Sequence, residues 1–160
     1  MPIRINFNDV YTDIKTLAGM VGENMYDTMI AISGGGLIPA RLLRTHLKIP
    51  VYSVCVVSYD KNNAKTDSYD ILQWLSEREL KGLRGKRVLV VDDLDDTRGT
   101  LVFITNKLKE DGLDNIGVAV LYNKMKDKDG ELSPDVRYYN AVDTEDKWIV
   151  FPWDEPELFN

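Results

Sequence analysis

Residues 88–100 read VLVVDDLDDTRGT, and this stretch predicts the fold class of the chain. Its first four residues, Val88 to Val91, are all apolar, which is typical of a strand buried on both faces of a parallel sheet. Four carboxylates follow within five positions, and a small turn rich in hydroxyl groups then opens a helical pattern over residues 101–110, which stops at Gly112. We therefore expect a strand–loop–helix unit whose loop carries the chemistry.

Strand and helix patterns alternate on both sides of this unit. Helical spacing of apolar residues occurs at residues 9–26, with Asn8 or Asp9 placed to cap the start, and again at residues 37–47. Short apolar runs typical of strands occur at residues 29–32, 51–57, 116–122 and 148–151. The alternation predicts an α/β fold, with a mostly parallel central sheet flanked by helices, and a single domain over residues 1–160.

Three loops of unusual composition each follow a predicted strand directly, at residues 33–36, 92–100 and 123–126. Ligands of open α/β sheets bind in the crevice beyond the carboxyl ends of the strands. We therefore expect these three loops to meet at one crevice.

The composition excludes several classes of function. Twenty basic against twenty-six acidic residues give a net charge of −6, so we expect no nucleic acid partner. No apolar run approaches the roughly 18 residues of a membrane span, and the first residues lack the apolar stretch of a signal peptide, which predicts no membrane partner and a cytoplasmic location. A lone cysteine, Cys55, and a lone histidine, His46, exclude an internal disulfide and a Cys/His metal site. We expect Cys55 to be a buried strand thiol and His46 to lie on a helix surface.

The acidic loop has the groups that bind a ribose phosphate. Residues 97–100 offer successive backbone N–H groups and two hydroxyls at a helix N-terminus, which suits a phosphate monoester. The adjacent pair Asp92 and Asp93 suits vicinal ribose hydroxyls or Mg²⁺, because both prefer hard oxygen ligands. A solvated acidic turn and a response-regulator receiver domain are the competing interpretations. Neither explains the Asp-Thr-x-x-Thr continuation, and 87 residues precede a strand that would open a receiver.

The apolar strand, the acidic pair and the Asp-Thr-x-x-Thr run together resemble the donor-binding signature of the type I phosphoribosyltransferases. The resemblance implies that fold, with a small hood formed by the C-terminal segment. It implies that Asp92 and Asp93 hold the ribose hydroxyls, with Asp93 near Mg²⁺, and that Asp96 is the catalytic residue near N7 of a purine. The remaining donor-binding residues that it implies are Asp95, Thr97, Arg98, Gly99 and Thr100. Arg98 is a departure, because members of the family usually have glycine after Asp-Thr.

Two other loops resemble parts of the same family. The run Ser33, Gly34, Gly35 and Gly36 resembles the pyrophosphate loop of the 6-oxopurine enzymes, and the short fungal-type hypoxanthine-guanine enzymes share its all-glycine form. Many other relatives have Lys or Arg at the position of Gly34. Ser58 and Tyr59 open a polar stretch at residues 60–70, which resembles the mobile lid of the family, and Lys65 within it is placed to reach a pyrophosphate oxygen.

The acceptor half of the resemblance lies near the C-terminus. Lys124 follows the strand at residues 116–122 and would donate to the 6-oxo group of the purine. In the segment from Asp146 to Asp154, Trp148 would stack on the purine, and backbone groups around Ile149 and Asp154 would read its 2-position. Without the resemblance, a surface lysine and a core tryptophan would be the ordinary interpretations.

The resemblance implies a purine-salvage transferase that moves the 5-phosphoribosyl group from 5-phosphoribosyl-1-pyrophosphate to hypoxanthine, guanine or xanthine, with Mg²⁺ as cofactor. The products would be a nucleoside 5′-monophosphate and pyrophosphate. A non-catalytic nucleotide-binding regulator and a phosphoribosyltransferase for another base stay open as alternatives. Relatives are usually dimers or tetramers, so we expect a homodimer or homotetramer.

Overall fold

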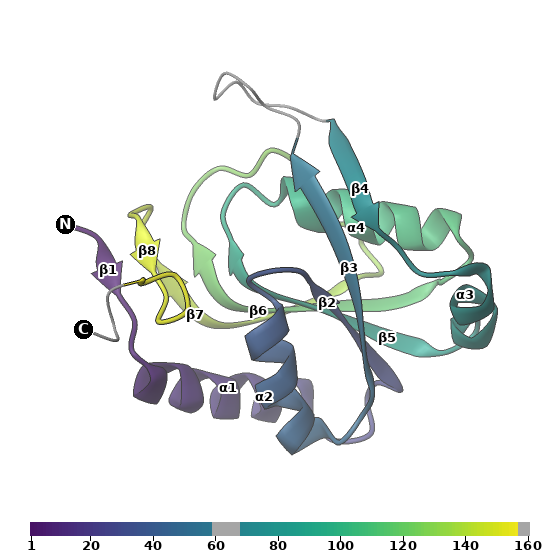
Figure 1. The fold of residues 1–160 in the computed structure, drawn as a ribbon, viewed down its shortest axis with the longest axis horizontal. Coiled ribbons are helices and arrows are strands. Elements are labelled where there is room, and N and C mark those ends of the chain that lie inside the picture. The colour runs from purple at the N-terminus through teal and green to yellow at the C-terminus, as the bar shows by residue number, and fades with distance from the viewer. Residues whose placement is uncertain (59–67, 157–160) are drawn as a thin grey trace.

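The computed structural model describes residues 1–58 and 68–156, which contain one large and one small sheet with four helices (Figure 1). The large sheet has the spatial order β4 (Tyr69–Gln73), β3 (Val51–Ser58), β2 (Thr28–Ile32), β5 (Arg87–Asp95), β6 (Asn115–Lys124) and β7 (Arg137–Thr144). All neighbouring strands are parallel except β4, which runs antiparallel to β3. The predicted α/β class with a mostly parallel sheet is confirmed.

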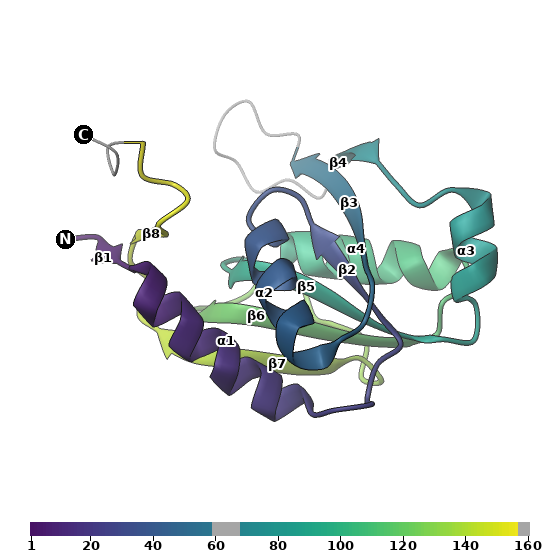
Figure 2. The ribbon, with the colours of Figure 1, turned by 60° about the horizontal axis from the view of Figure 1, so that its bottom comes forward.

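Helices cover both faces of this sheet (Figure 2). They are α1 (Phe7–Val21), α2 (Leu37–Leu47), α3 (Glu77–Leu83) and α4 (Gly99–Glu110). Leu89 and Val91 of β5 pack in the core beneath α1 and α2, whereas Val88 and Val90 pack in the core beneath α3 and α4. Successive side chains of a strand point to opposite faces, so the apolar run of β5 supplies both cores at once.

The first helix differs in its bounds from the prediction. It begins at Phe7 and ends at Val21, and its cap is Asn6 rather than Asn8 or Asp9. The Asn6 side chain accepts a hydrogen bond from the backbone N–H of Asp9, and the Asp9 carboxylate accepts one from the backbone N–H of Asn6. This reciprocal capping box satisfies two donors that a helix start leaves free, so the helix begins earlier than its apolar pattern.

Several elements have no apolar pattern in the sequence and were not predicted. Strand β7 is half-buried along most of its length, and β4 is a largely exposed edge strand. Helix α3 has seven residues and depends on a capping box between Ser76 and Glu79. Tyr69 and Asp70 belong to β4, whereas the rest of the predicted loop lies largely outside the described residues.

The small sheet joins the two ends of the described chain. Strand β1 (Ile3–Arg4) pairs in parallel with β8 (Ile149–Val150), and both lie to one side of the large sheet in Figures 1 and 2. The expected hood therefore includes an N-terminal strand as well as the C-terminal segment. Across the described residues, we find no helix with the length and apolar character needed to cross a membrane.

The lone cysteine and the lone histidine lie in different environments. Cys55 is a free thiol of intermediate burial, so the expectation of a buried thiol is wrong. It lies in β3, which is covered at the sheet edge only by the exposed strand β4. His46 is exposed on α2, as expected.

Candidate functional site

The three loops of unusual composition meet at the carboxyl edge of the sheet. Strands β2, β5 and β6 are parallel neighbours, so their carboxyl ends lie at the same edge. The glycine loop after β2 reaches the acidic loop, because a Cβ atom at Gly35 would clash with the carboxylate of Asp93. The loop after β6 reaches it from the other side, where Lys124 forms an ion pair with Asp96 at 3.5 Å. The expected crevice is therefore present.

Asp92 and Asp93 are half-buried carboxylates at the end of β5. Burial raises the pKa of both, and for Asp92 the neighbouring carboxylate of Asp93 raises it further. The indole N–H of Trp153 donates to Oδ2 of Asp93 at 3.3 Å, which links the hood to this pair. Trp153 was not predicted as a site residue, although it precedes Asp154 within the segment expected to bind the purine.

This acidic pair suits Mg²⁺. Burial, and for Asp92 also the charge of Asp93, raises the pKa of these carboxylates, and a bound cation would offset both effects. Among residues 1–58 and 68–156, no group of three or more His, Cys, Asp or Glu side chains is arranged to hold a metal ion. Mg²⁺ commonly takes one or two carboxylates, with substrate phosphates and water as its other ligands. The donor set therefore fits Mg²⁺ bound together with a phosphorylated substrate.

The glycine loop has one position that requires glycine for backbone packing and one that does not. A Cβ atom at Gly36 would meet the backbone oxygens of Val91 and Ile32, so the loop and the central strand approach too closely for a side chain. Gly34 has open space where a Cβ atom would lie. The fold therefore has room for a larger side chain at position 34.

The turn before α4 explains the departure at Arg98. Arg98 has a φ of 71°, in the left-handed region that glycine adopts without strain. Its guanidinium donates to Oδ2 of Asp95 at 2.7 and 3.0 Å and lies 4.7 Å from the ring centre of Tyr138. These contacts hold Arg98 in a conformation that is unfavourable for a side chain. Thr97, Gly99 and Thr100 complete the turn, and the hydroxyl of Tyr69 fills the space where a Cβ atom of Gly99 would lie.

Asp95 and Asp96 have opposite environments, although they are adjacent in sequence. The side chain of Asp95 has no exposed surface, and its Oδ2 accepts hydrogen bonds from Arg98 and from the hydroxyl of Tyr138 at 2.7 Å. Because Asp95 is enclosed beneath the turn, its carboxylate does not face the crevice where a donor would bind. The side chain of Asp95 supports the turn, and donor binding by Asp95 stays a prediction.

Asp96 faces the crevice and is surrounded by cations. Its Oδ1 lies 3.0 Å from Nζ of Lys126 and 3.5 Å from Nζ of Lys124. Asp146 forms ion pairs with the same two lysines, at 3.2 and 3.6 Å. The hydrogen bond to Asp96 raises the pKa of Lys126 and keeps it protonated. Lys126 was not predicted, because a lysine in a charged loop has no sequence pattern that distinguishes it.

A cavity of about 580 Å³ lies between these charges and the hood. Its lining includes the predicted residues Asp93, Asp96, Lys124, Trp148, Ile149 and Asp154. Trp148 is 75% exposed, which rules out core packing and leaves its ring at the rim. Ile149 is buried within β8, and the carboxylate of Asp154 accepts a hydrogen bond from the backbone N–H of Phe151 at 3.3 Å.

Two further residues of this cavity come from opposite ends of the chain. Arg4 of β1 and Glu155 both line the cavity and form an ion pair. The sequence analysis did not predict either, because only the β1–β8 pairing brings them together. Ser58 lies exposed at the end of β3, whereas Tyr59 and Lys65 fall outside the described residues.

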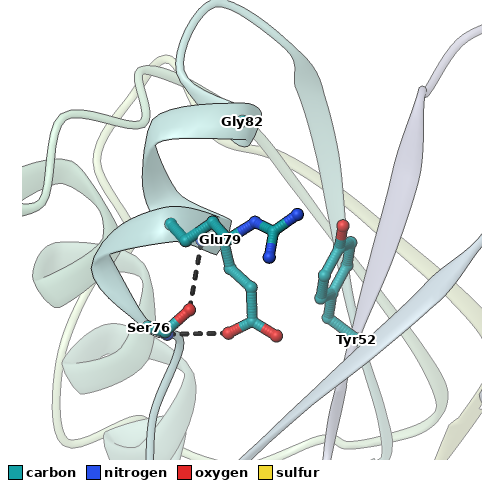
Figure 3. Close-up of a pocket in the computed structure, with 5 residues that line it drawn as sticks. Tyr52, Ser76, Glu79 and Gly82 are labelled. Atoms are coloured by element: carbon teal, nitrogen blue, oxygen red, sulfur yellow. Dashed lines mark hydrogen bonds between the residues drawn. The ribbon is translucent and has the colours of Figure 1, made fainter.

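A second concave surface lies between β3 and α3 (Figure 3). Its lining includes Tyr52, Ser76 and Glu79. Ser76 and Glu79 are committed to the cap of α3, where Oγ of Ser76 accepts from the backbone N–H of Glu79 and Oε2 of Glu79 accepts from the backbone N–H of Ser76. Tyr52 is near the start of β3, at the end opposite the crevice, so this surface is separate from the acidic loop.

Comparison with known proteins agrees with this architecture. The parallel sheet, with its acidic loop at the carboxyl edge, has the type I phosphoribosyltransferase fold. The family model described as the phosphoribosyl transferase domain matches residues 8–160, and the chain belongs to this family.

Relatives match nearly the whole chain. It is 32% identical to the hypoxanthine-guanine phosphoribosyltransferase of Saccharomyces cerevisiae, over 96% of this chain and 86% of the relative. A Neisseria gonorrhoeae protein, whose crystal structure has bound ppGpp, is 41% identical with a TM-score of 0.87, covering 99% of this chain and 93% of its own. The purine phosphoribosyltransferase of Pyrococcus horikoshii is 31% identical with a TM-score of 0.79, covering 99% and 98%.

Proposed function

We propose that this protein is a purine-salvage enzyme that transfers the 5-phosphoribosyl group from 5-phosphoribosyl-1-pyrophosphate to a 6-oxopurine. The observation that carries the proposal is the pairing of Asp96 with Lys124 across one cavity, next to Asp92, Asp93 and the turn before α4. An acceptor base and a ribose phosphate can therefore bind side by side. The yeast relative named as a hypoxanthine-guanine phosphoribosyltransferase supports the same substrate class.

The phosphoribosyl donor binds on the side of the site that is formed by the loops after β2 and β5. Backbone N–H groups of residues 97–100 hold the 5′-phosphate at the N-terminus of α4, where the helix dipole favours an anion. Asp92 and Asp93 accept hydrogen bonds from the ribose hydroxyls, and Asp93 would hold Mg²⁺. The Ser33–Gly36 loop holds the pyrophosphate through its backbone. Arg98 and Asp95 act on the phosphate only indirectly, because they hold the turn in shape.

The acceptor occupies the hood side. Lys124 is buried and positively charged, and it donates to the 6-oxo group of the purine, which a 6-amino group would not accept. Trp148 covers the base at the rim of the cavity. The segment from Ile149 to Asp154 reads the 2-position through backbone groups. The bound ppGpp of the Neisseria gonorrhoeae relative, which contains a guanine and a ribose 5′-diphosphate, supports a guanine-sized base beside a phosphorylated ribose.

The proposed reaction needs three contributions, two from side chains of the protein and one from Mg²⁺. As N9 of the base bonds to C1′, the bond from C1′ to the pyrophosphate oxygen breaks and its electron pair leaves with pyrophosphate. Positive charge grows on C1′, and the carboxylates of Asp92 and Asp93 stabilise it more strongly than they stabilise the ground state. Asp96 accepts the proton that the base loses at N7. Mg²⁺, when bound with the donor, neutralises charge on the leaving pyrophosphate.

The direct test is incubation of the purified protein with Mg²⁺, labelled 5-phosphoribosyl-1-pyrophosphate and a panel of bases. We expect nucleoside 5′-monophosphates from hypoxanthine, guanine or xanthine, and none from adenine or orotate. Product from orotate or adenine alone would make the protein a phosphoribosyltransferase for another base. Tight nucleotide binding without any product would make it a non-catalytic regulator.

The proposal also includes the oligomeric state of the protein. We infer a homodimer or homotetramer, and light scattering of the purified chain tests it. Exposed apolar side chains along the edge strand β4 and the neighbouring strand β3, including Ile71, Leu72 and Val57, support burial of this edge by another subunit. A monomer at micromolar concentration would contradict this inference.

A further inference from the structure

Lys128 lies in the loop after β6 and has a side chain that is only 13% exposed. Its Nζ donates to three backbone carbonyl oxygens, those of Lys124 at 2.8 Å, Asp96 at 3.0 Å and Asp95 at 3.1 Å. An ammonium group has three N–H donors, so these carbonyls use all of them. Lys128 thus joins the end of β6 to the loop that follows β5.

The three carbonyl oxygens belong to two parts of the candidate site, one proposed to bind the ribose phosphate and one proposed to bind the base. The oxygens of Asp95 and Asp96 come from the end of β5 and the start of the loop proposed to hold the ribose phosphate, whereas that of Lys124 comes from the end of β6, where the base is proposed to bind. Three carbonyl oxygens that face one point repel each other unless a donor lies between them. The ammonium group of Lys128 lies at this point, and its three N–H groups diverge toward the three oxygens.

Two neighbouring contacts reinforce the junction. The backbone N–H of Asp129 donates to the carbonyl oxygen of Thr97 at 2.9 Å, so the loop after β6 is attached to the phosphate turn as well. The Oδ1 atom of Asp95 is buried without a hydrogen bond and lies 3.7 Å from Nζ of Lys128. Burial lowers the pKa of Lys128, and the nearby charge of Asp95 opposes this shift.

We propose that Lys128 is a positioning residue that sets the spacing between the Asp96 loop and Lys124, and so keeps the base and the ribose phosphate in register. The proposal rests on the proposed function for the identity of the two halves. Lys128 reaches no ligand itself, because its three donors are occupied by the protein. Its effect is on ligands that must touch both loops at once.

If Lys128 sets the spacing between the two loops, its loss weakens the binding of some ligands more than that of others. A general loss of folding would weaken the binding of all ligands alike. GMP spans both halves, whereas ribose 5-phosphate touches only the donor loop. In Lys128→Met, which keeps an unbranched side chain one atom shorter and removes the donors, we expect GMP binding to weaken at least about tenfold and ribose 5-phosphate binding to change less than about threefold. A misplacement of about 1 Å commonly costs on the order of 10²-fold in rate, so kcat for transfer should fall by about 10- to 100-fold.

The matched control is Lys109→Met, which removes a lysine of α4 that is paired with Asp135 at the surface. It should leave both binding constants and kcat unchanged. Lys128→Arg provides a second variant in case Lys128→Met does not fold. Its planar guanidinium keeps the charge, but its N–H groups lie in one plane and do not match three carbonyl oxygens arranged around one nitrogen. We expect a smaller loss in the same direction, about threefold for GMP and none for ribose 5-phosphate.

Equal weakening of GMP and ribose 5-phosphate in a folded variant would overturn the proposal, because it would show a general structural role. Unchanged GMP binding in Lys128→Met would also overturn it. The proposed function is tested separately by transfer activity of the unmodified protein. If that protein binds GMP but forms no product, the enzyme assignment fails, and the two binding ratios still decide the role of Lys128.

Discussion

Asp96 is the residue on which the proposed chemistry depends. It faces the cavity between two lysines, whereas its neighbour Asp95 is enclosed. Asp95 is the last residue of β5 and its side chain is buried, whereas Asp96 begins the loop that follows and its side chain is partly exposed. The two aspartates therefore have different roles: Asp96 faces the substrate cavity, and Asp95 binds other residues of the protein.

For Asp96→Asn we expect kcat to fall about 10²-fold or more, the usual effect of removing a general base. Asparagine keeps the size of the side chain and one acceptor oxygen, and the phosphate turn is unchanged, so donor affinity should stay within about threefold. Steady-state kinetics and isothermal titration with the donor measure both quantities. Glu145→Gln, which alters an exposed carboxylate paired with Lys147, is the control. Normal turnover of Asp96→Asn would remove this residue from the mechanism.

Asp95 should matter for stability. Its fully buried carboxylate is bound by Arg98 and Tyr138 and lies near Lys128. Removing one partner of a buried ion pair typically costs about 3–5 kcal/mol, because the other charge stays buried without a partner. We expect Asp95→Ala to lower the free energy of unfolding by about 3 kcal/mol, measured by urea denaturation. A loss below about 1 kcal/mol would show that the network contributes little.

At the scale of elements, the glycine loop is shaped by what packs against it. The acidic loop occupies the space beside Gly35, and the central strand occupies the space beside Gly36. The loop after β2 and the loop after β5 therefore form one packed unit. We therefore expect a substitution in the glycine loop after β2 to change the affinity of ligands that bind the acidic loop after β5.

Gly35→Ala tests this packing. The added methyl group would displace the carboxylate of Asp93, so we expect weaker donor binding and a higher Mg²⁺ requirement for transfer. A decrease of about tenfold or more in donor affinity corresponds to about 1.4 kcal/mol. The control is Gly19→Ala in α1, where the added atom meets open space and favours the helix. If donor affinity of Gly35→Ala equals that of Gly19→Ala, Asp93 is not held by the glycine loop.

At the scale of the whole molecule, the hood closes the site with both chain ends. The β1–β8 pairing and the ion pair of Arg4 with Glu155 place residues near both ends of the described chain on one wall of the cavity. The opposite edge of the large sheet is held by a different contact. There Arg87, at the start of β5, donates to both carboxylate oxygens of Asp27 at 2.9 and 3.2 Å.

This contact makes stability depend on pH in acid. Hydrogen bonds from Arg87 lower the pKa of Asp27 to about 2, below its ordinary value of 3.8. Because the folded-state pKa is the lower one, the contact stabilises the fold fully above about pH 4. Its contribution is lost as the pH falls through 3.8 toward 2. Asp27→Asn should be less stable than the unmodified protein at neutral pH, and the difference should shrink below pH 4. Thermal melting across pH 2–7 measures it, and a difference independent of pH would contradict this account.

The sequence by itself determined the central strand, the strand and helix alternation, and the two loops that carry the glycines and carboxylates. These features are local: an apolar run of strand length and a turn of special residues have the same meaning wherever they occur. Helix α2 matches its predicted bounds for this reason. Strands β4 and β7 were missed because β4 is largely exposed and β7 only half-buried, so their place in the sheet depends on pairing with neighbouring strands rather than on an apolar pattern.

Only the tertiary structure decided which carboxylate faces the cavity, that Arg98 takes the place of a glycine by pairing with Asp95, and that Lys128 joins the two loops. It also brought Arg4 and Trp153 to the site from distant positions. Each of these depends on contacts between residues brought together by the parallel sheet. A single sequence contains no local signal for such contacts, because the free energy that selects them arises only when the strands are packed side by side.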